Sequence, residues 1–279
     1  MPLIGRFNTL RVSKIVDFGV YVDAENFGQV LLPKRYVPDN AELGTDVNVF
    51  LYFDSESRLI ATTLKPKVQV GECAYLKVAQ INRVGAFMNW GLPKDLLVPY
   101  GQQPKTMEAE KSYVVYVYQD PYSELITASG KLRDFLRETN DNFELSQKVN
   151  LLICARTDLG YKAVINNTHM GMLFDSQLLQ PVRIGQRLDG YIKTIREDGK
   201  IDLSVQLEGQ ASRDDLSTKI MRHIQENGGT SAVNDKSAPD DIYRLFQVSK
   251  GNFKKAVGGL LKRGDVFYEG LDIKASPTE

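Results

Sequence analysis

The feature that most constrains this chain is a short pattern that occurs three times in its 279 residues. In the two strong copies, an aliphatic residue, an Ile three positions later and a hydrophobic-Gly pair lead directly into a short apolar segment. The strong copies cover residues 12–23 and 78–89, and a weaker third covers 153–166. Copies separated by roughly 65 to 75 residues are typical of small domains in tandem rather than of a solenoid built from short units.

Each copy is followed by the same order of predicted strands. A hydrophobic strand ends in a turn, and a long alternating strand follows, as at residues 47–53 and 113–118. β-branched and aromatic residues dominate these strands, as a half-buried pleated surface favours. A further short strand completes each repeat. About five strands therefore fall in roughly 65 residues, and their economical closure is a small antiparallel barrel without exposed edges.

The motifs of the first repeat resemble those of a known domain. The pattern V-x-x-I-x-x-F-G-x-Y-V, followed by G-x-V-L-L-P and a G-x-x-V-x-V strand, is similar to the S1 RNA-binding domain, an OB-type five-stranded barrel. The second repeat resembles it with Val84 in place of the first aromatic residue. The third repeat resembles it mainly by position, most clearly over residues 184–192.

The aromatic pair of the first repeat is the first candidate site. Phe18 and Tyr21 are three residues apart, so a regular strand would place them on opposite faces. A bulge at Gly19 would bring both rings to one face, and Gly tolerates a bulge. Two rings on the outer face would stack unpaired bases, at about 1–3 kcal/mol per base. The alternative is that the rings fill the barrel core.

The other two repeats carry different residues at these places. In the second repeat the rings are Phe87 and Trp90, with the same two alternatives. In the third, Leu159 and Lys162 replace the aromatic pair, and Phe174 takes the position where S1 domains often carry a histidine. Lys162 and Phe174 are candidate RNA contacts. We expect this copy to have lost much of its stacking surface, and a mainly structural role is the alternative.

The last seventy or so residues follow a helical rather than a strand pattern. Ser212, Ser237 and Ser249 are predicted N-caps of three helices, and residues 265–273 form a predicted hairpin. Three helices and a hairpin are typical of a winged helix. The predicted third helix carries candidate nucleic-acid contacts on its outer side, for which a solvated surface is the alternative: Lys250, Lys254 and Lys255.

The complete order of domains resembles the bacterial conserved virulence factor B family. The resemblance implies a mostly β chain of three S1/OB-type five-stranded barrels and an α+β winged helix. It also implies an RNA-binding regulator of gene expression and virulence, in which barrels and winged helix both bind. The expected boundaries are barrels at 1–65, 66–130 and 145–208, a helical linker at 131–144 and the winged helix at 211–276.

The charge balance favours single strands over duplexes. The formal net charge is zero and the pI is near 6.8, whereas duplex binders that depend on phosphate neutralisation are usually basic. A neutral chain can bind single strands when stacking contributes much of the affinity and positive charge is local. The candidate local patches are Lys34 with Arg35, Lys65 with Lys67, and the lysines of the predicted third helix.

Enzymatic, metal and membrane functions find no support in the sequence. His169, predicted to be exposed in a loop, and His223 lie in different domains, and no P-loop, nucleophile elbow or HExxH motif occurs. Cys73 and Cys154 lack metal-type spacing and are predicted to be reduced thiols. There is no long apolar run and no signal-peptide pattern. We expect a cytoplasmic, non-enzymatic protein without cofactor.

Three hypotheses for function remain open. The first is a regulator that binds single-stranded RNA on its barrels. The second is a scaffold whose barrels and winged helix dock proteins of the transcription or translation machinery. The third is a DNA-binding regulator that uses the winged helix. Salt-dependent binding of unstructured RNA favours the first, whereas capture of a protein partner after nuclease treatment favours the second.

Overall fold

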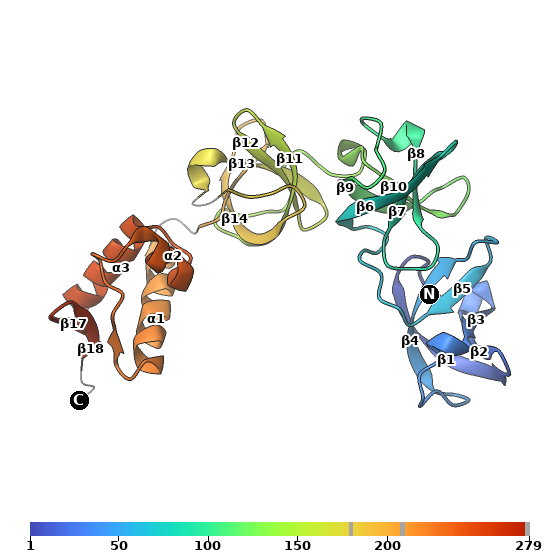
Figure 1. Cartoon of the computed structure of the whole chain (residues 1–279), viewed down its shortest axis with the longest axis horizontal. Coiled ribbons are helices and arrows are strands. Elements are labelled where there is room, and N and C mark those ends of the chain that lie inside the picture. The colour runs from blue at the N-terminus through green and yellow to red at the C-terminus, as the bar shows by residue number, and fades with distance from the viewer. Residues whose placement is uncertain (179–180, 207–209, 277–279) are drawn as a thin grey trace.

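The computed structural model describes residues 1–178, 181–206 and 210–276, without the side chains of 210–215. The chain is mostly strand, with three closed or nearly closed five-stranded barrels followed by a winged helix with three helices in the described range. The predicted fold class is therefore confirmed. The four units follow one another in chain order along a bent row (Figure 1).

The first barrel is closed, with strand order β1-β2-β3-β5-β4. Its strands are β1 (Phe7–Val16), β2 (Gly19–Asp23), β3 (Gln29–Pro33), β4 (Asp46–Phe53) and β5 (Leu59–Thr62). The third barrel repeats this order with β11 (Lys148–Thr157), β12 (Gly160–Ile165), β13 (His169–Phe174), β14 (Arg187–Ile195) and β15 (Ile201–Ser204).

The second barrel is a five-stranded sheet in the order β10-β9-β6-β7-β8, and its two end strands lie next to each other. Its strands are β6 (Cys73–Asn82), β7 (Gly85–Asn89), β8 (Leu96–Pro99), β9 (Ser112–Gln119) and β10 (Ile126–Ser129). The alternation of buried valines with more exposed residues along these strands explains why the sequence pattern located them.

A glycine at the equivalent position of each repeat explains why the pattern recurs. Gly19, Gly85 and Gly160 open β2, β7 and β12 at φ of +154°, +157° and +150°, and an added Cβ at each would lie 2.2–2.3 Å from a carbonyl oxygen of the neighbouring strand. Such an approach leaves no room for a side chain. The structural role of these glycines is thus to let two strands come together.

The predicted bulge at Gly19 is wrong. Gly19 pairs in register with Val16 and Pro33, and the register shift lies on the partner strand, between Val12 and Lys14. Phe18 belongs to the two-residue turn between β1 and β2. A residue in a turn does not follow the alternation of a strand, so Phe18 can lie on the same side as a residue three positions later.

The predicted helical linker at 131–144 is also corrected. The segment contains one 3₁₀ turn (Leu132–Asp134), after which Arg137 and Thr139 form isolated bridges to the third barrel. The Phe135 ring stacks on Tyr116 of β9 with centroids 4.8 Å apart. These tertiary contacts outweigh the helix propensity of the segment. The linker consequently holds the second and third barrels together.

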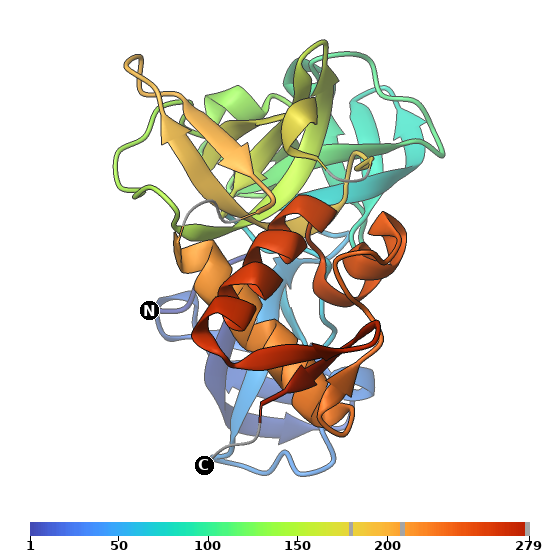
Figure 2. The same ribbon diagram turned by 90° about the vertical axis from the view of Figure 1, so that its left-hand side faces the viewer.

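The winged helix consists of α1 (Gln210–Glu226), β16 (Thr230–Ser231), α2 (Pro239–Phe246), α3 (Lys250–Arg263), β17 (Val266–Glu269) and β18 (Asp272–Ala275). Figure 2 faces this domain, with α1 in orange beside α3 in red. The Ser249 hydroxyl accepts the Asn252 N–H at 3.2 Å, so the cap predicted for α3 is confirmed.

The other two predicted caps are wrong. Ser212 lies inside α1 (Gln210–Glu226), so it is not the N-cap. α2 begins at Pro239, and its N-cap residue is Ala238 rather than Ser237. The Ser237 hydroxyl instead accepts the Asn234 N–H at 3.0 Å, within the loop before α2.

Candidate nucleic-acid interface

Two aromatic rings lie together on the outer face of the first barrel. Phe18 is 58% exposed at the tip of its turn, and Tyr21 is half-buried on β2. Their ring centroids are 6.5 Å apart, with the planes at 82°. Val20 and Val22 point inward and are buried in the core. Neither aromatic ring therefore fills the barrel.

The surface extends beyond the two rings. Leu31 of β3 pairs directly with Tyr21 and, in the parallel direction, with Ile60 of β5. Leu31 is half-buried and continues an apolar floor beside Tyr21, whereas Ile60 packs against the core shared with the second barrel. The alternation of β3, with Val30 and Leu32 inside, was sufficient to place Leu31 outside, but nothing in the sequence paired it with β5.

Positive charge lies next to this surface. Lys34 and Arg35 occupy the 3₁₀ turn Lys34–Tyr36 that follows β3, and both side chains are exposed. The Lys34 N–H donates to the Phe18 carbonyl at 2.9 Å, which fixes this turn against the aromatic one. Within the described part of the chain, neither side chain forms an ion pair. Both cations are thus available to an anionic ligand.

The second barrel retains only part of the equivalent surface. Phe87 is half-buried and pairs with Leu97, as Tyr21 pairs with Leu31. Trp90 is only 3% exposed, and its indole N–H donates to the Lys94 carbonyl at 2.7 Å. The predicted stacking role of Trp90 is therefore wrong.

Trp90 instead belongs to a hydrophobic core shared by the first and second barrels. Its ring packs edge-on against Phe50 of β4, with centroids 5.8 Å apart at 76°. The Lys94 ammonium also donates to the Asp54 carbonyl of the first barrel, at 2.7 Å. Trp90 follows the last residue of β7, at the point where the neighbouring barrel covers this edge.

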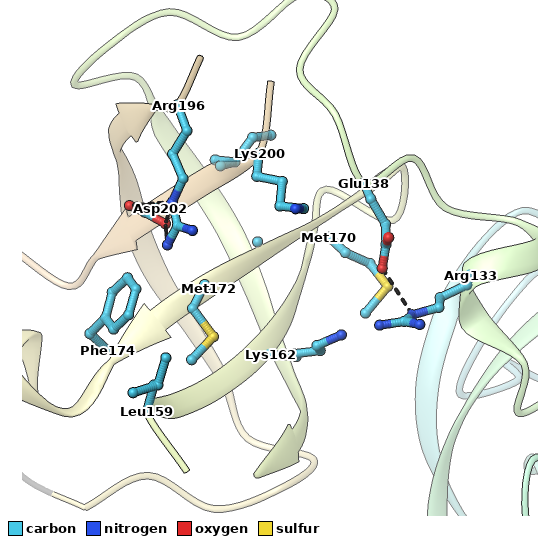
Figure 3. A pocket seen from close by; sticks show the side chains of 12 residues that line it. Arg133, Glu138, Leu159, Lys162, Met170, Met172, Phe174, Arg196, Lys200 and Asp202 are labelled. Carbon is cyan, nitrogen blue, oxygen red and sulfur yellow. Dashed lines mark hydrogen bonds and ion pairs between the residues drawn. The ribbon is translucent and has the colours of Figure 1, made fainter. Parts of the chain in front are cut away.

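The third barrel has a pocket on the corresponding face. Leu159, Lys162 and Met172 take the places of Phe18, Tyr21 and Leu31, as the strand register shows. Phe174 pairs with Gly160 and so takes the place of Pro33. Together with Arg133 and Glu138, these side chains line a cavity of about 230 Å³ (Figure 3).

His169 fastens the linker to the third barrel. The prediction that it is exposed is wrong, because the residue is only 2% exposed. Its Nε2 lies 2.8 Å from the Asp141 carboxylate, and its ring packs edge-on against Phe143. Burial, together with the nearby Arg137 guanidinium, lowers the pKa of His169. The ring acts as a structural contact between the linker and the third barrel.

The lysines at the start of α3 are not equivalent. The Lys250 ammonium donates to the carbonyls of Lys236 and Ser237, at 3.2 and 2.9 Å, so it braces the loop before α2. Its nucleic-acid contact stays a prediction. Lys254 and Lys255 are exposed and form no ion pair within the described residues. On the opposite side of α3, Phe253, Ala256, Val257 and Leu260 are buried.

Two other features bear on chemistry. Among the described residues, no group of three His, Cys, Asp or Glu side chains is placed to hold a metal ion. No helix in the described part of the chain is long and apolar enough to cross a membrane.

Comparison with known proteins matches both ends of the chain to domain families. Residues 4–64 match an S1 domain, and residues 218–274 match a CvfB-like winged helix domain. A Bacillus subtilis protein described as uncharacterized protein YitL is 28% identical over 288 residues, which cover 95% of this chain and 91% of that protein. Conserved virulence factor B of Staphylococcus epidermidis is 25% identical, over 81% of this chain and 78% of that protein.

A solved structure from Streptococcus pneumoniae, described as a multidomain protein with nucleic acid binding domains, covers 98% of both chains at 23% identity and a TM-score of 0.42. The two domain matches and the relatives of similar length agree with the order of barrels and winged helix described above. The chain therefore carries an S1 domain and a CvfB-like winged helix domain, and it is similar over most of its length to conserved virulence factor B.

Proposed function

We propose that this protein is a regulator that binds single-stranded RNA by stacking bases on the outer face of its first barrel. The observation that carries the proposal is the exposed Phe18–Tyr21 pair, which lies in the segment that matches an S1 domain. S1 domains and winged helices are nucleic-acid-binding domain types, which supports the broader class of ligand. The proposed role is non-enzymatic.

The geometry favours unpaired bases as the ligand. Rings set at 82° cannot stack on one flat base pair together, whereas two successive bases of a flexible strand can each meet one ring. Each such contact contributes roughly 1–3 kcal/mol. Lys34 and Arg35, on the adjacent turn, supply partners for phosphate groups. This combination explains how a chain with no net charge can bind a polyanion.

The winged helix supplies a second contact region in this proposal. Lys254 and Lys255 are exposed on the early part of α3, the part of a helix-turn-helix that faces nucleic acid. Their charges act on phosphate groups and carry no sequence information by themselves. The barrels would then bind bases, while the winged helix adds electrostatic affinity.

The decisive experiment replaces the aromatic pair. Phe18→Ala with Tyr21→Ala should weaken binding of a fluorescently labelled single-stranded RNA by about thirtyfold or more, because two stacking contacts of roughly 1–3 kcal/mol each are lost. The matched control is Tyr122→Ala, because that ring is 95% exposed in a turn of the second barrel. Duplex RNA and duplex DNA should bind more weakly than single strands.

Three outcomes separate the hypotheses. Unchanged RNA affinity in the folded double variant contradicts the stacking proposal. Preference for duplex DNA supports the winged-helix DNA-binding regulator instead. Absence of any nucleic-acid binding, with a protein partner captured after nuclease treatment, supports the scaffold.

A further inference from the structure

The cavity on the third barrel is not explained by the proposal above. It opens on the face that corresponds to the aromatic platform of the first barrel. The third barrel has lost both of those aromatic residues. Its wall is completed by the linker from the second barrel, which contributes Arg133 and Glu138 (Figure 3). A composite pocket of this kind could not be read from one repeat alone.

The lining combines an apolar surface with an aromatic edge. Leu159, Met170 and Met172 supply aliphatic and thioether groups, and Phe174 stands at one side. Methionine adapts to flat ring systems through its flexible, polarisable side chain. A volume of about 230 Å³ accommodates a small planar molecule rather than a peptide segment.

The cationic groups around the pocket differ in whether a carboxylate holds them. Arg196 lies over the Phe174 ring at 5.6 Å and is held by the Asp202 carboxylate at 2.7 Å. Arg133 is held by Glu138 at 2.9 Å. Lys162 forms no ion pair within the described residues, and in Figure 3 it extends toward the end of the pocket where Arg133 lies.

Lys162 and Arg133 together give this end of the pocket a positive surplus. Two cationic side chains share it with one carboxylate, that of Glu138. An anionic group placed between the lysine and the guanidinium would therefore be stabilised. A ligand that fills the pocket needs a flat, largely apolar body with a negative group attached at one end.

We propose that this pocket binds one nucleotide, with its base against Met172 and Phe174 and its phosphate between Lys162 and Arg133. The inference takes its class of ligand from the proposed RNA-binding function, but it assigns a separate site with different chemistry. The first barrel stacks bases on two rings, whereas the third holds one base in an open pocket and binds its phosphate. The nucleotide can come from an RNA strand or be free, and the two sources are distinguished below.

Methionine methyl groups provide a local readout. The chain has six methionines, of which Met170 and Met172 line the pocket. In the full-length protein labelled with ¹³C at the methionine methyl groups, each of the four nucleoside 5′-monophosphates is titrated and compared with the uncharged nucleosides. We expect at least one monophosphate to shift the Met172 signal, and to bind more tightly than its nucleoside.

The variant Lys162→Glu should weaken binding of that monophosphate by about tenfold, the loss expected for one ionic hydrogen bond. The control is Arg183→Glu, which makes the same change of charge on an exposed side chain of the third barrel away from the pocket lining. The methionine spectrum also reports whether each variant is folded.

The source of the nucleotide follows from a second titration with a short mixed-sequence RNA. A Met172 shift with both ligands indicates that the pocket accepts free nucleotides, whereas a shift with RNA alone, abolished in Lys162→Glu, assigns the pocket to a strand. No shift with either ligand overturns the inference, as does equal binding of monophosphate and nucleoside. The Phe18→Ala/Tyr21→Ala variant should retain the monophosphate shift, so failure of the first-barrel proposal is recognised separately.

Discussion

We expect Trp90→Ala to destabilise the first two barrels together without acting on RNA directly. The side chain is only 3% exposed, packs against Phe50 of the neighbouring barrel and donates its N–H to the Lys94 carbonyl. Truncation of a buried Trp to Ala costs about 3–5 kcal/mol. That loss is large compared with the 5–15 kcal/mol by which domains of this kind are stable.

Part of this cost can be assigned separately. Trp90→Phe keeps a ring in the core but leaves the Lys94 carbonyl without its donor, which costs roughly 1–3 kcal/mol. Phe50→Ala removes the other half of the ring contact, and an aromatic pair contributes about 0.5–1.5 kcal/mol beyond area burial. A double-mutant cycle between positions 50 and 90 should therefore give a positive coupling of that size.

Urea unfolding followed by circular dichroism provides the assay. With an m value on the order of 2 kcal/mol per molar urea, the Trp90→Ala midpoint should fall by about 1.5–2.5 M. Tyr122→Ala, at an exposed ring, should change stability by less than about 0.5 kcal/mol. A Trp90→Ala midpoint equal to that of Tyr122→Ala would refute the shared core. Loss of RNA affinity in Trp90→Phe under conditions where it is fully folded would restore the stacking role.

Three further predictions concern the buried cysteines, His169 and the lysines of α3. Burial raises the pKa of Cys73 to about 12 and that of Cys154 to about 11, so both thiols should react with a disulfide reagent at pH 7 only after unfolding; fast labelling of the native protein would contradict this. Because burial and Arg137 lower the pKa of His169 below its unfolded value of about 6.5, its contribution to stability is present above that pH and is lost as the pH falls below it. Replacement by Asn should flatten the pH dependence of the unfolding midpoint between pH 7 and 5, and an unaltered dependence would count against the assignment. Lys254→Glu with Lys255→Glu should lower RNA affinity about tenfold or more and reduce its salt dependence. The control Lys262→Glu with Arg263→Glu, farther along α3, should have a smaller effect. Equal effects of the two double variants would mean that the overall charge of the helix, and not its early part, is responsible.

The sequence by itself determined the repeated architecture. Strand alternation is a signal that can be read within one element. The recurring hydrophobic-Gly pair can be read in the same way, because the glycine is required where two adjacent strands of one barrel approach closely. The same local logic placed the Ser249 cap and the buried face of α3. For the candidate site, the sequence identified Phe18 and Tyr21, although the turn that brings them together was mistaken for a bulge.

The tertiary structure alone decided what the remaining candidates do. Trp90 is buried against Phe50 of the first barrel, 40 positions earlier in the chain. His169 is buried at the linker, where it contacts Asp141, 28 positions earlier. The linker does not form the predicted helix because Phe135 stacks on Tyr116 of the second barrel. Patterns of hydrophobic period describe one element at a time, whereas burial at a junction depends on which surface another domain brings against it. The composite pocket that contains Lys162 and Arg133 exists for the same reason.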